Sequence, residues 1–378
     1  MTDLAGDPVF QLNCILWMLQ PLPPELQRAR EGTGPVAVLH DAGYRLHALG
    51  KPLTATPNVE RFLAAEMGLK GRPAPDAIAS APSEERWLVV ECKKSSFGAQ
   101  SSTAKQAINL LARADDLSIV AGTAPGGARV GGAVLYATRQ SETKKLQKTL
   151  DNLSKQLDNK GRKIAPISTL AINVTAGIGV SAQIVGGSLS GPAASAFAQS
   201  TLVLPAAGID EELPRTLYLI PYDPGAVQGQ DPSEQSHCLK ILLARGRAEA
   251  ASSIGNKSDT GTTILNADEL LSKSTHGLSD YWADHNDRQR AAGLILNFVK
   301  EALRDMGKHA RTRRNVPNVN EGRAPHRLEI TIGSAEQRQA CADAVIGYPL
   351  PGEPRPEDSF LTELPFADLP GDDTSPGR

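Results

Sequence analysis

Three features are scarce in this 378-residue sequence, and each scarcity excludes a class of protein. The four cysteines are far apart and form no CxxC pair, which excludes a disulfide framework and a structural zinc site and favours a reducing compartment. No apolar run is long enough for a membrane helix, and the first residues lack the basic and then apolar pattern of a secretion signal. Aromatic residues make up only 4% of the chain, too few for an extended base-stacking platform. We therefore expect a cytoplasmic protein that has no membrane contact.

Several catalytic sequence motifs are also missing. The chain contains no phosphate-binding loop of the GxxxxGKS or GxxxxGKT type, so any ATP-driven motor would be a separate subunit. It contains neither the GxSxG elbow of serine hydrolases nor the HExxH ligand pair of zinc proteases. Any catalytic chemistry must therefore come from other side chains.

The net charge of -2 averages over two parts of opposite sign. Residues 352–378 contain seven acidic and two basic side chains, so this segment has a charge of -5 and the remainder +3. The segment is rich in proline, and we expect it to be disordered. It either docks on a partner, folds over a basic groove as a nucleic-acid mimic, or only solubilises the chain.

The most informative stretch is residues 86–94, RWLVVECKK. Alternate side chains of a strand share a face, so Glu91 and Lys93 point to one side and Cys92 to the other. Both faces are apolar before these residues, which indicates a strand buried in a sheet whose charged end emerges at a cleft. A solvated strand end is the structural alternative.

The residue types at this strand end suit phosphodiester hydrolysis. Mg²⁺ prefers oxygen ligands and needs few carboxylates, so Asp76 and Glu91 would suffice as acidic ligands, with the backbone carbonyl of Cys92 as a further one. Bound Mg²⁺ relieves charge repulsion at the phosphate and acidifies water. Lys93 would position the attacking water or stabilise charge in the transition state.

Pro75-Asp76 and Glu91-Cys92-Lys93 resemble the PD-(D/E)xK motif of the restriction-endonuclease-like superfamily, over residues 58–140. The order of the predicted elements supports the resemblance, because a helix, two strands, a helix and a strand are expected there in turn. These elements are a helix capped by Asn58 that ends at Gly68, strands at 77–81 and 87–93, a helix at 101–114 and a strand at 130–138. The resemblance implies an α/β fold, a restriction-endonuclease-like mixed sheet flanked by helices, and Mg²⁺ as cofactor with Mn²⁺ as a substitute.

The resemblance also implies two further site positions. Many members carry a glutamate on the helix before the motif, and Glu60 is preferred here over Glu66. Some members place a glutamine on the following helix, which Gln106 matches, although Leu110 stands where an aromatic residue would follow.

Basic residues suggest where a nucleic acid would bind. The nearest to the motif in sequence are Lys94, Lys105 and Arg113, which we expect to contact phosphates. Arg311, Arg313 and Arg314 follow a helix predicted over residues 287–306 and would lie in a loop that tracks a duplex. The alternative is a solvated helix end whose cations offset the helix dipole.

The predicted organisation has four parts. An N-terminal helical or irregular segment occupies residues 1–57, and the nuclease core with extra strands occupies 58–222. A mainly helical region follows at 233–348, and the acidic disordered tail spans 349–378. A charged helix at 140–160 contains lysines 144, 145, 148, 155 and 160.

The sequence predicts a Mg²⁺-dependent endodeoxyribonuclease, a DNA-binding hydrolase of the kind that serves bacterial restriction or antiphage defence. Because cutting a duplex needs two strand cleavages, we expect a homodimer with one active site in each chain. A separate motor or sensor subunit is a further candidate partner. The alternatives are a repair, recombination or RNA-cleaving nuclease, and a non-cutting nucleic-acid-binding subunit of a defence complex.

Overall fold

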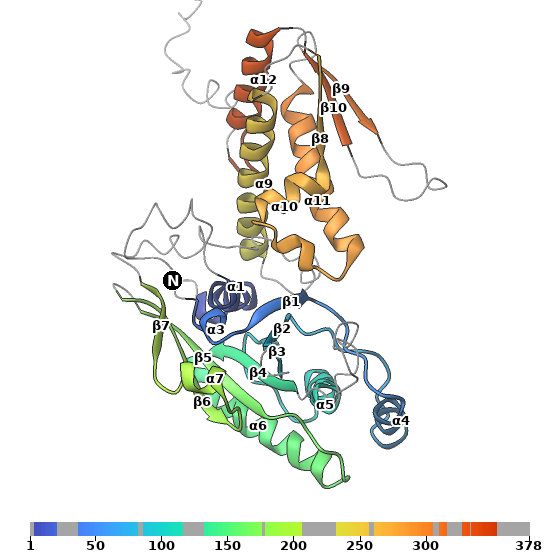
Figure 1. Cartoon of the computed structure of the whole chain (residues 1–378), viewed down its shortest axis with the longest axis vertical. Helices are drawn as coiled ribbons and strands as arrows, with labels where there is room; N and C mark the ends of the chain where they lie inside the picture. Colours follow the sequence, from blue (N-terminus) through green and yellow to red (C-terminus); the bar gives the residue numbers. More distant parts are fainter. Residues whose placement is uncertain are drawn as a thin grey trace, which may run out of the picture. The chain divides into compact units, whose positions relative to one another are not determined.

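The computed structural model describes residues 4–20, 37–81, 86–115, 132–175, 178–205, 232–256, 261–304, 310–315, 327–332 and 334–353. The chain forms two compact units (Figure 1): Met1–Gln230 with Ala267–Gly293, and Asp231–Asn266 with Leu294–Arg378. This division differs from the predicted one. The segment 1–57 belongs to the first unit, and so do residues 267–293, which were expected in the C-terminal region.

The first unit contains a seven-stranded mixed sheet in which the strands lie in chain order. The strands are β1 (Arg45–Leu49), β2 (Ala77–Ala81), β3 (Arg86–Cys92), β4 (Gly132–Arg139), β5 (Ile167–Thr175), β6 (Gly179–Gly187) and β7 (Thr201–Pro205). Strands β3, β4 and β5 are parallel, and all other neighbours are antiparallel. The expected α/β class with a mixed sheet flanked by helices is confirmed.

Helices cover both faces of this sheet (Figure 1). Helix α1 (Pro8–Leu19) contacts β1, β3, β4 and β7, and the side chain of Asp7 caps it by accepting from the N–H groups of Val9 and Phe10. Helices α4 (Pro57–Glu66), α5 (Ser102–Ala114) and α6 (Gln140–Asp158) share a core with alternate residues of the strands, among them Val89. Strand β3 therefore lies between α1 on one face of the sheet and α4, α5 and α6 on the other.

Local signals predicted much of this unit. Strand β2 has the expected limits, and α5 and α6 agree with the expected helices to within two residues. Helix α4 ends as expected, since Gly68 adopts a φ of 62° and Leu69 donates to the carbonyl of Leu63 at 2.9 Å. The expected capping role of Asn58 was wrong, because the N-cap residue is Thr56 and its side chain makes no capping bond.

A late segment of the chain completes the edge of the sheet. It contains α10 (Ala267–Ser274), η4 (Leu278–Tyr281) and the start of α11 (His285–Ala302). The N–H of Ala283 donates to the carbonyl of Leu49 at 3.0 Å, so residues far apart in sequence meet beside β1. Smaller elements of the unit are η1 (Leu4–Gly6), α3 (Val38–Asp41) and α7 (Pro192–Ala196).

The second unit combines helices with an antiparallel sheet. Its helices are α9 (Pro232–Gly255), α12 (Ala335–Gly347) and the end of α11. Its strands β8 (Gly261–Asn266), β10 (Arg327–Ile332) and β9 (Ala310–Asn315) lie in that order. The prediction of a loop for Arg311, Arg313 and Arg314 was therefore wrong, because these residues belong to β9.

Residues 354–378 of the expected acidic tail lie outside the described residues. None of the helices in the described part of the chain combines the length and the apolar composition needed to cross a lipid bilayer.

Candidate active site

The predicted catalytic strand end is formed by β3. Leu88, Val89 and Val90 are fully buried, as expected of a central strand with both faces covered. Beyond the strand, the N–H of Lys93 donates to the carbonyl of Ala137 at 2.9 Å and extends the ladder with β4. The charged end of the motif is therefore held in the sheet by backbone hydrogen bonds.

Glu91 and Lys93 point to the same side of the strand, as their spacing predicts. Lys93 Nζ lies 2.6 Å from Glu91 Oε1, and both a hydrogen bond and an ion pair join them. The Glu91 side chain is only 5% exposed and that of Lys93 is 21% exposed. The second carboxylate oxygen, Glu91 Oε2, is buried and has no hydrogen-bond partner among the described residues.

Burial sets the electrostatics of this pair. Burial raises the pKa of Glu91 above its usual value, and the Lys93 ammonium together with the backbone N–H of Asp76 only partly offsets this effect. For Lys93, burial lowers the pKa, but the charges of Glu91 and Asp76 outweigh it, so the net shift is upward. The two directions agree physically because the carboxylate loses nearly all its hydration, whereas the ammonium keeps part of it.

Asp76 lies at the start of β2, beside the end of β3. Its Oδ2 accepts a hydrogen bond from the N–H of Cys92 at 2.6 Å, and its own carbonyl accepts one from Gly50 at 3.2 Å. Ala77 pairs with Val90 in the antiparallel ladder, so Asp76 lies next to the Glu91 position. The structure thus brings together Asp76, Glu91 and Lys93, the three charged residues of the motif.

Three neighbouring side chains were not anticipated from the sequence. The Lys93 carbonyl accepts hydrogen bonds from Gln11 Nε2 at 3.1 Å and from Thr138 Oγ1 at 2.8 Å. Gln11 Nε2 also donates to the Ala5 carbonyl at 2.7 Å. Tyr136 is opposite Glu91 in the parallel ladder, and burial together with the charges of Glu91 and Asp76 raises the pKa of its hydroxyl. One signal was available: Gln11 is a polar residue inside the apolar helix sequence PVFQLNCILWML.

Cys92 points to the opposite face of the sheet, as predicted. Its side chain is 4% exposed, and burial raises the pKa of its thiol well above the usual value. Cys14 of α1 is likewise buried, and it is close enough for its charge to affect Cys92. The Cys92 side chain is therefore part of the core beneath α1, and only its backbone is available to the site.

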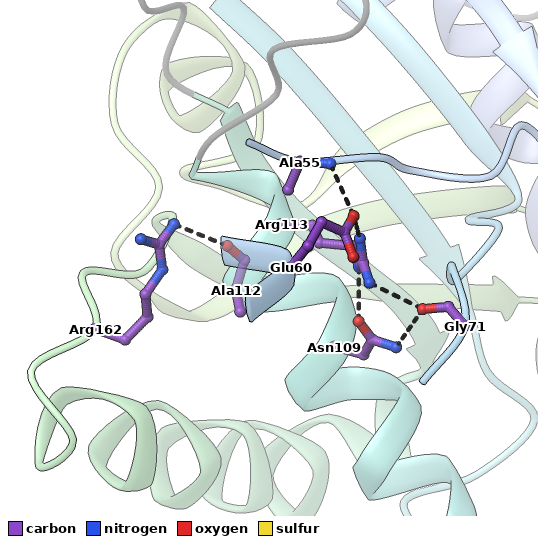
Figure 2. Close-up of polar contacts among 7 residues, drawn as sticks. All are labelled: Ala55, Glu60, Gly71, Asn109, Ala112, Arg113 and Arg162. Atoms are coloured by element: carbon purple, nitrogen blue, oxygen red, sulfur yellow. Dashed lines mark hydrogen bonds and ion pairs between the residues drawn. The ribbon is translucent and has the colours of Figure 1, made fainter. Parts of the chain in front are cut away.

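Glu60 lies in a second polar cluster, shown in Figure 2. Its carboxylate forms an ion pair with Arg113 and accepts a hydrogen bond from the N–H of Ala55 at 3.3 Å. Arg113 also donates to Asn109 Oδ1 at 2.7 Å and to the Gly71 carbonyl at 2.9 Å. This cluster joins α4, α5 and the turn at Gly71, and within the described residues Glu60 makes no bond to the motif.

The expectation that Arg113 contacts phosphate was wrong. Its side chain is 1% exposed, and its hydrogen bonds are all directed into the protein. Glu66, the alternative to Glu60, is 60% exposed and lies 3.8 Å from Lys160. It contacts none of the motif residues in the described part of the chain.

The remaining predicted nucleic-acid-binding residues lie in two places. Lys94, Lys105 and Gln106 are exposed in the first unit. In the second unit, Arg311, Arg313 and Arg314 occupy the register positions opposite Thr331, Glu329 and Leu328 of β10.

The donor set at the motif is compatible with a hard divalent cation. The described residues contain no group of three or more histidine, cysteine, aspartate or glutamate side chains arranged to hold a metal ion. Mg²⁺ typically takes only one or two carboxylates, a number that Asp76 and Glu91 supply. The buried Glu91 Oε2 lacks a hydrogen-bond partner among the described residues, and a bound cation would satisfy it.

A cavity of about 560 Å³ lies elsewhere, lined by the second half of α6, residues 164–167 and residues 187–188. It includes no motif residue and has no concentration of charge, so the motif remains the best-supported candidate site. Comparisons of the chain with models of protein families, with curated proteins and with solved structures found no match.

Proposed function

We propose that this chain is a Mg²⁺-dependent endonuclease that hydrolyses phosphodiester bonds of DNA. The main support is the buried Glu91, which is hydrogen-bonded to Lys93 and keeps one carboxylate oxygen without a partner among the described residues. A buried carboxylate with an unsatisfied oxygen is costly for folding, and such costs are expected where a site binds a ligand. Asp76 adds a second acid at the same strand end.

In this proposal each motif residue has a separate task. Asp76, Glu91 and the backbone carbonyl of Cys92 would hold Mg²⁺, or Mn²⁺ in its place. The bound ion would acidify water and neutralise charge on the phosphate. Lys93 keeps its proton, because the net shift of its pKa is upward, and so supplies a positive charge next to the reacting phosphate.

Gln11 and Thr138 keep the Lys93 backbone in position for this task. Both side chains are fully buried, and both donate to the same carbonyl oxygen. A fixed backbone matters because the free energy of catalysis depends on accurate placement of the reacting groups.

The substrate and the biological setting come from the motif resemblance. We propose duplex DNA as substrate, a homodimer that cuts both strands, and a role in restriction or antiphage defence in the cytoplasm. A motor or sensor subunit would be encoded separately. A repair, recombination or RNA-cleaving nuclease and a non-cutting DNA-binding subunit are the competing outcomes of the experiment.

The experiment compares wild type with Lys93→Ala and Glu91→Gln on plasmid, branched and single-stranded DNA and on RNA, with Mg²⁺ or Mn²⁺. We expect cleavage of plasmid DNA and a loss of at least about 100-fold in each variant. The matched control is Lys70→Ala, an exposed lysine outside the motif, which should cut like wild type. If RNA or branched DNA is cleaved in preference to plasmid DNA, the assignment of duplex DNA as the substrate is wrong.

Calorimetric titration with Mn²⁺ tests the site without any need for turnover. Wild type should bind the ion, whereas Asp76→Ala and Glu91→Gln should bind it at least about tenfold more weakly. A folded wild-type protein that neither cuts any substrate nor binds the ion would contradict the proposed function.

A further inference from the structure

Helix α6 has one buried face and one solvent face along its whole length. The buried face consists of Thr143, Leu146, Leu150, Leu153 and Leu157. These residues recur at intervals of three and four, as expected of an amphipathic helix against a sheet. The opposite face is exposed to solvent.

The first half of this solvent face is basic. Lys144, Lys145 and Lys148 are exposed, and none of them has an ion-pair partner in the part of the chain that the structure describes.

Two acids lie within three residues of these lysines, Glu142 and Asp151, and both have other partners. Glu142 accepts hydrogen bonds from Ser96 N at 3.0 Å and Ser96 Oγ at 2.6 Å and lies 3.6 Å from Arg139. Asp151 Oδ1 accepts a hydrogen bond from Gln147 Nε2 at 2.7 Å. The hydrogen bonds from Ser96 lower the pKa of Glu142 most, followed by the charge of Arg139, and the charge of Lys145 contributes only after these.

In the second half of the same face, acidic residues accompany the lysines. The exposed Lys155 lies between the exposed acids Asp151 and Asp158 in the sequence. Lys160, after the helix end, pairs with Glu66 at 3.8 Å and donates to the Glu66 carbonyl at 2.9 Å. By residue count, residues 140–150 contain three lysines and one acid, a net charge of +2, whereas residues 151–160 contain two lysines and two acids and are neutral. The excess positive charge is therefore concentrated in the first half of the helix. Like charges four residues apart, such as Lys144 and Lys148, slightly destabilise a helix, so folding does not favour this arrangement.

The basic half of α6 lies beside the segment that leaves the motif. Ser96, three residues after Lys93, is bonded to Glu142, and the Phe97 carbonyl accepts a hydrogen bond from Thr149 Oγ1 at 3.3 Å. Residues 93–97 thus run along the same turns of the helix that present the three lysines. The contacts on both sides of these turns fix the helix next to the candidate site.

We infer that Lys144, Lys145 and Lys148 form a phosphate-binding surface for the backbone of duplex DNA beside the cleavage site. The choice of DNA as occupant rests on the proposed function and on charge complementarity, since a row of unpaired cations matches the regular phosphates of a duplex. Lysine ammonium groups bind phosphates as point charges, so this surface supplies affinity without sequence preference. It is distinct from the residues predicted from the sequence to contact nucleic acid.

The test measures DNA binding and cleavage separately. A triple variant, Lys144→Gln with Lys145→Gln and Lys148→Gln, is compared with wild type and with a matched triple variant. The matched variant replaces Lys70, Lys155 and Lys163, which are exposed lysines of the first unit outside the first half of α6, so its net charge changes equally. Binding of a short fluorescent duplex is followed by anisotropy in EDTA over a series of salt concentrations.

We expect the α6 variant to bind roughly 10- to 100-fold more weakly at low salt, with a slope of log K against log salt reduced by about 2 to 3. The matched variant should keep the wild-type slope. In cleavage assays the α6 variant should show a raised KM and a kcat within about threefold of wild type, because the lysines do not touch the reacting atoms.

The outcomes separate this inference from the proposed function. If wild type binds DNA through these lysines but does not cut it, the result supports the phosphate-binding surface and contradicts the proposed nuclease activity. If wild type cuts DNA and both triple variants keep its KM and its salt slope, the result contradicts the phosphate-binding surface and supports the proposed nuclease activity. The phosphate-binding surface is also refuted if wild type binds no duplex. It is likewise refuted if the three lysines are required for binding to vesicles of phosphatidylserine but not for binding to duplex DNA.

Discussion

Lys93 Nζ donates to Glu91 Oε1 at 2.6 Å, and this contact joins a carboxylate that is 5% exposed to an ammonium that is 21% exposed. The unequal exposure means that the two partners respond differently to mutation. A lysine that reaches water tolerates the loss of its partner, whereas a carboxylate that does not reach water is left with an uncompensated charge.

We expect Glu91→Gln to change the free energy of unfolding by about 1 kcal/mol or less, in either direction, because Lys93 can hydrate and the buried charge disappears. Lys93→Met should destabilise the protein by about 1–4 kcal/mol, since it leaves the Glu91 carboxylate without a countercharge. Urea denaturation at neutral pH without metal measures both values. Equal destabilisation by the two changes would contradict this description of the pair.

Thr138→Val should lower kcat by about 10- to 100-fold and change KM less than about threefold, because it removes one of two donors to the Lys93 carbonyl. Thr138→Ser, which keeps the hydroxyl, should restore most of the activity. The control is Thr143→Val, where the lost bond runs to the Gln140 carbonyl within α6 at 2.8 Å. If both valine variants lose activity in proportion to stability, Thr138 has only a structural role.

Glu60→Gln should destabilise the protein in a pH-dependent way. Arg113 holds the pKa of Glu60 below its usual value, so the ionised pair contributes stability above the unfolded-state pKa of about 4.3 and loses it as pH falls through the lowered value. Because Glu60 is 35% exposed, we expect a difference of about 1–2 kcal/mol at neutral pH, less than for a fully buried pair.

Thermal melts of wild type and Glu60→Gln from pH 3 to pH 8 would show this dependence. The two melting temperatures should differ at neutral pH and converge below about pH 4. A constant difference over the whole range would show that the ion pair with Arg113 does not stabilise the fold.

Cys14 and Cys92 should resist alkylation in the native protein. Burial raises the pKa of both thiols well above the usual value, and the reactive thiolate is scarce as a result. Treatment with iodoacetamide followed by peptide mapping should leave both unmodified until urea unfolds the chain. Rapid native labelling of Cys92 would show that α1 does not cover β3 as the structure describes.

The sequence predicted the elements whose signals are local. The apolar run of residues 87–90 followed by Glu91 and Lys93 indicated a buried strand with a charged end, and the structure has both. Helix α6 was predicted as a charged helix rich in lysine, and α4 was expected to end at Gly68 because a left-handed residue favours glycine.

Long-range pairing was not accessible in the same way. Gln11 and Thr138 reach the Lys93 carbonyl across 82 and 45 positions of the sequence, and no local pattern indicates such a contact. Arg113 was expected to contact phosphate because the sequence gives the charge of a residue but does not give its burial. Arg311, Arg313 and Arg314 were expected in a loop because they follow a helix predicted to end before Gly307, and the pairing of β9 with β10 is not visible in the local sequence.

The bond from Gln11 to the Lys93 carbonyl has a consequence for any shortened version of this protein. A fragment trimmed to the sequence-defined motif, starting near α4, would keep every charged residue of the site but lose the amide that anchors its lysine from α1. Because α1 precedes β3 and β4 in the chain, the bond from Gln11 forms only after both strands have been synthesised. A motif moved to another protein without α1 would contain the charged residues but not the amide that holds the Lys93 backbone.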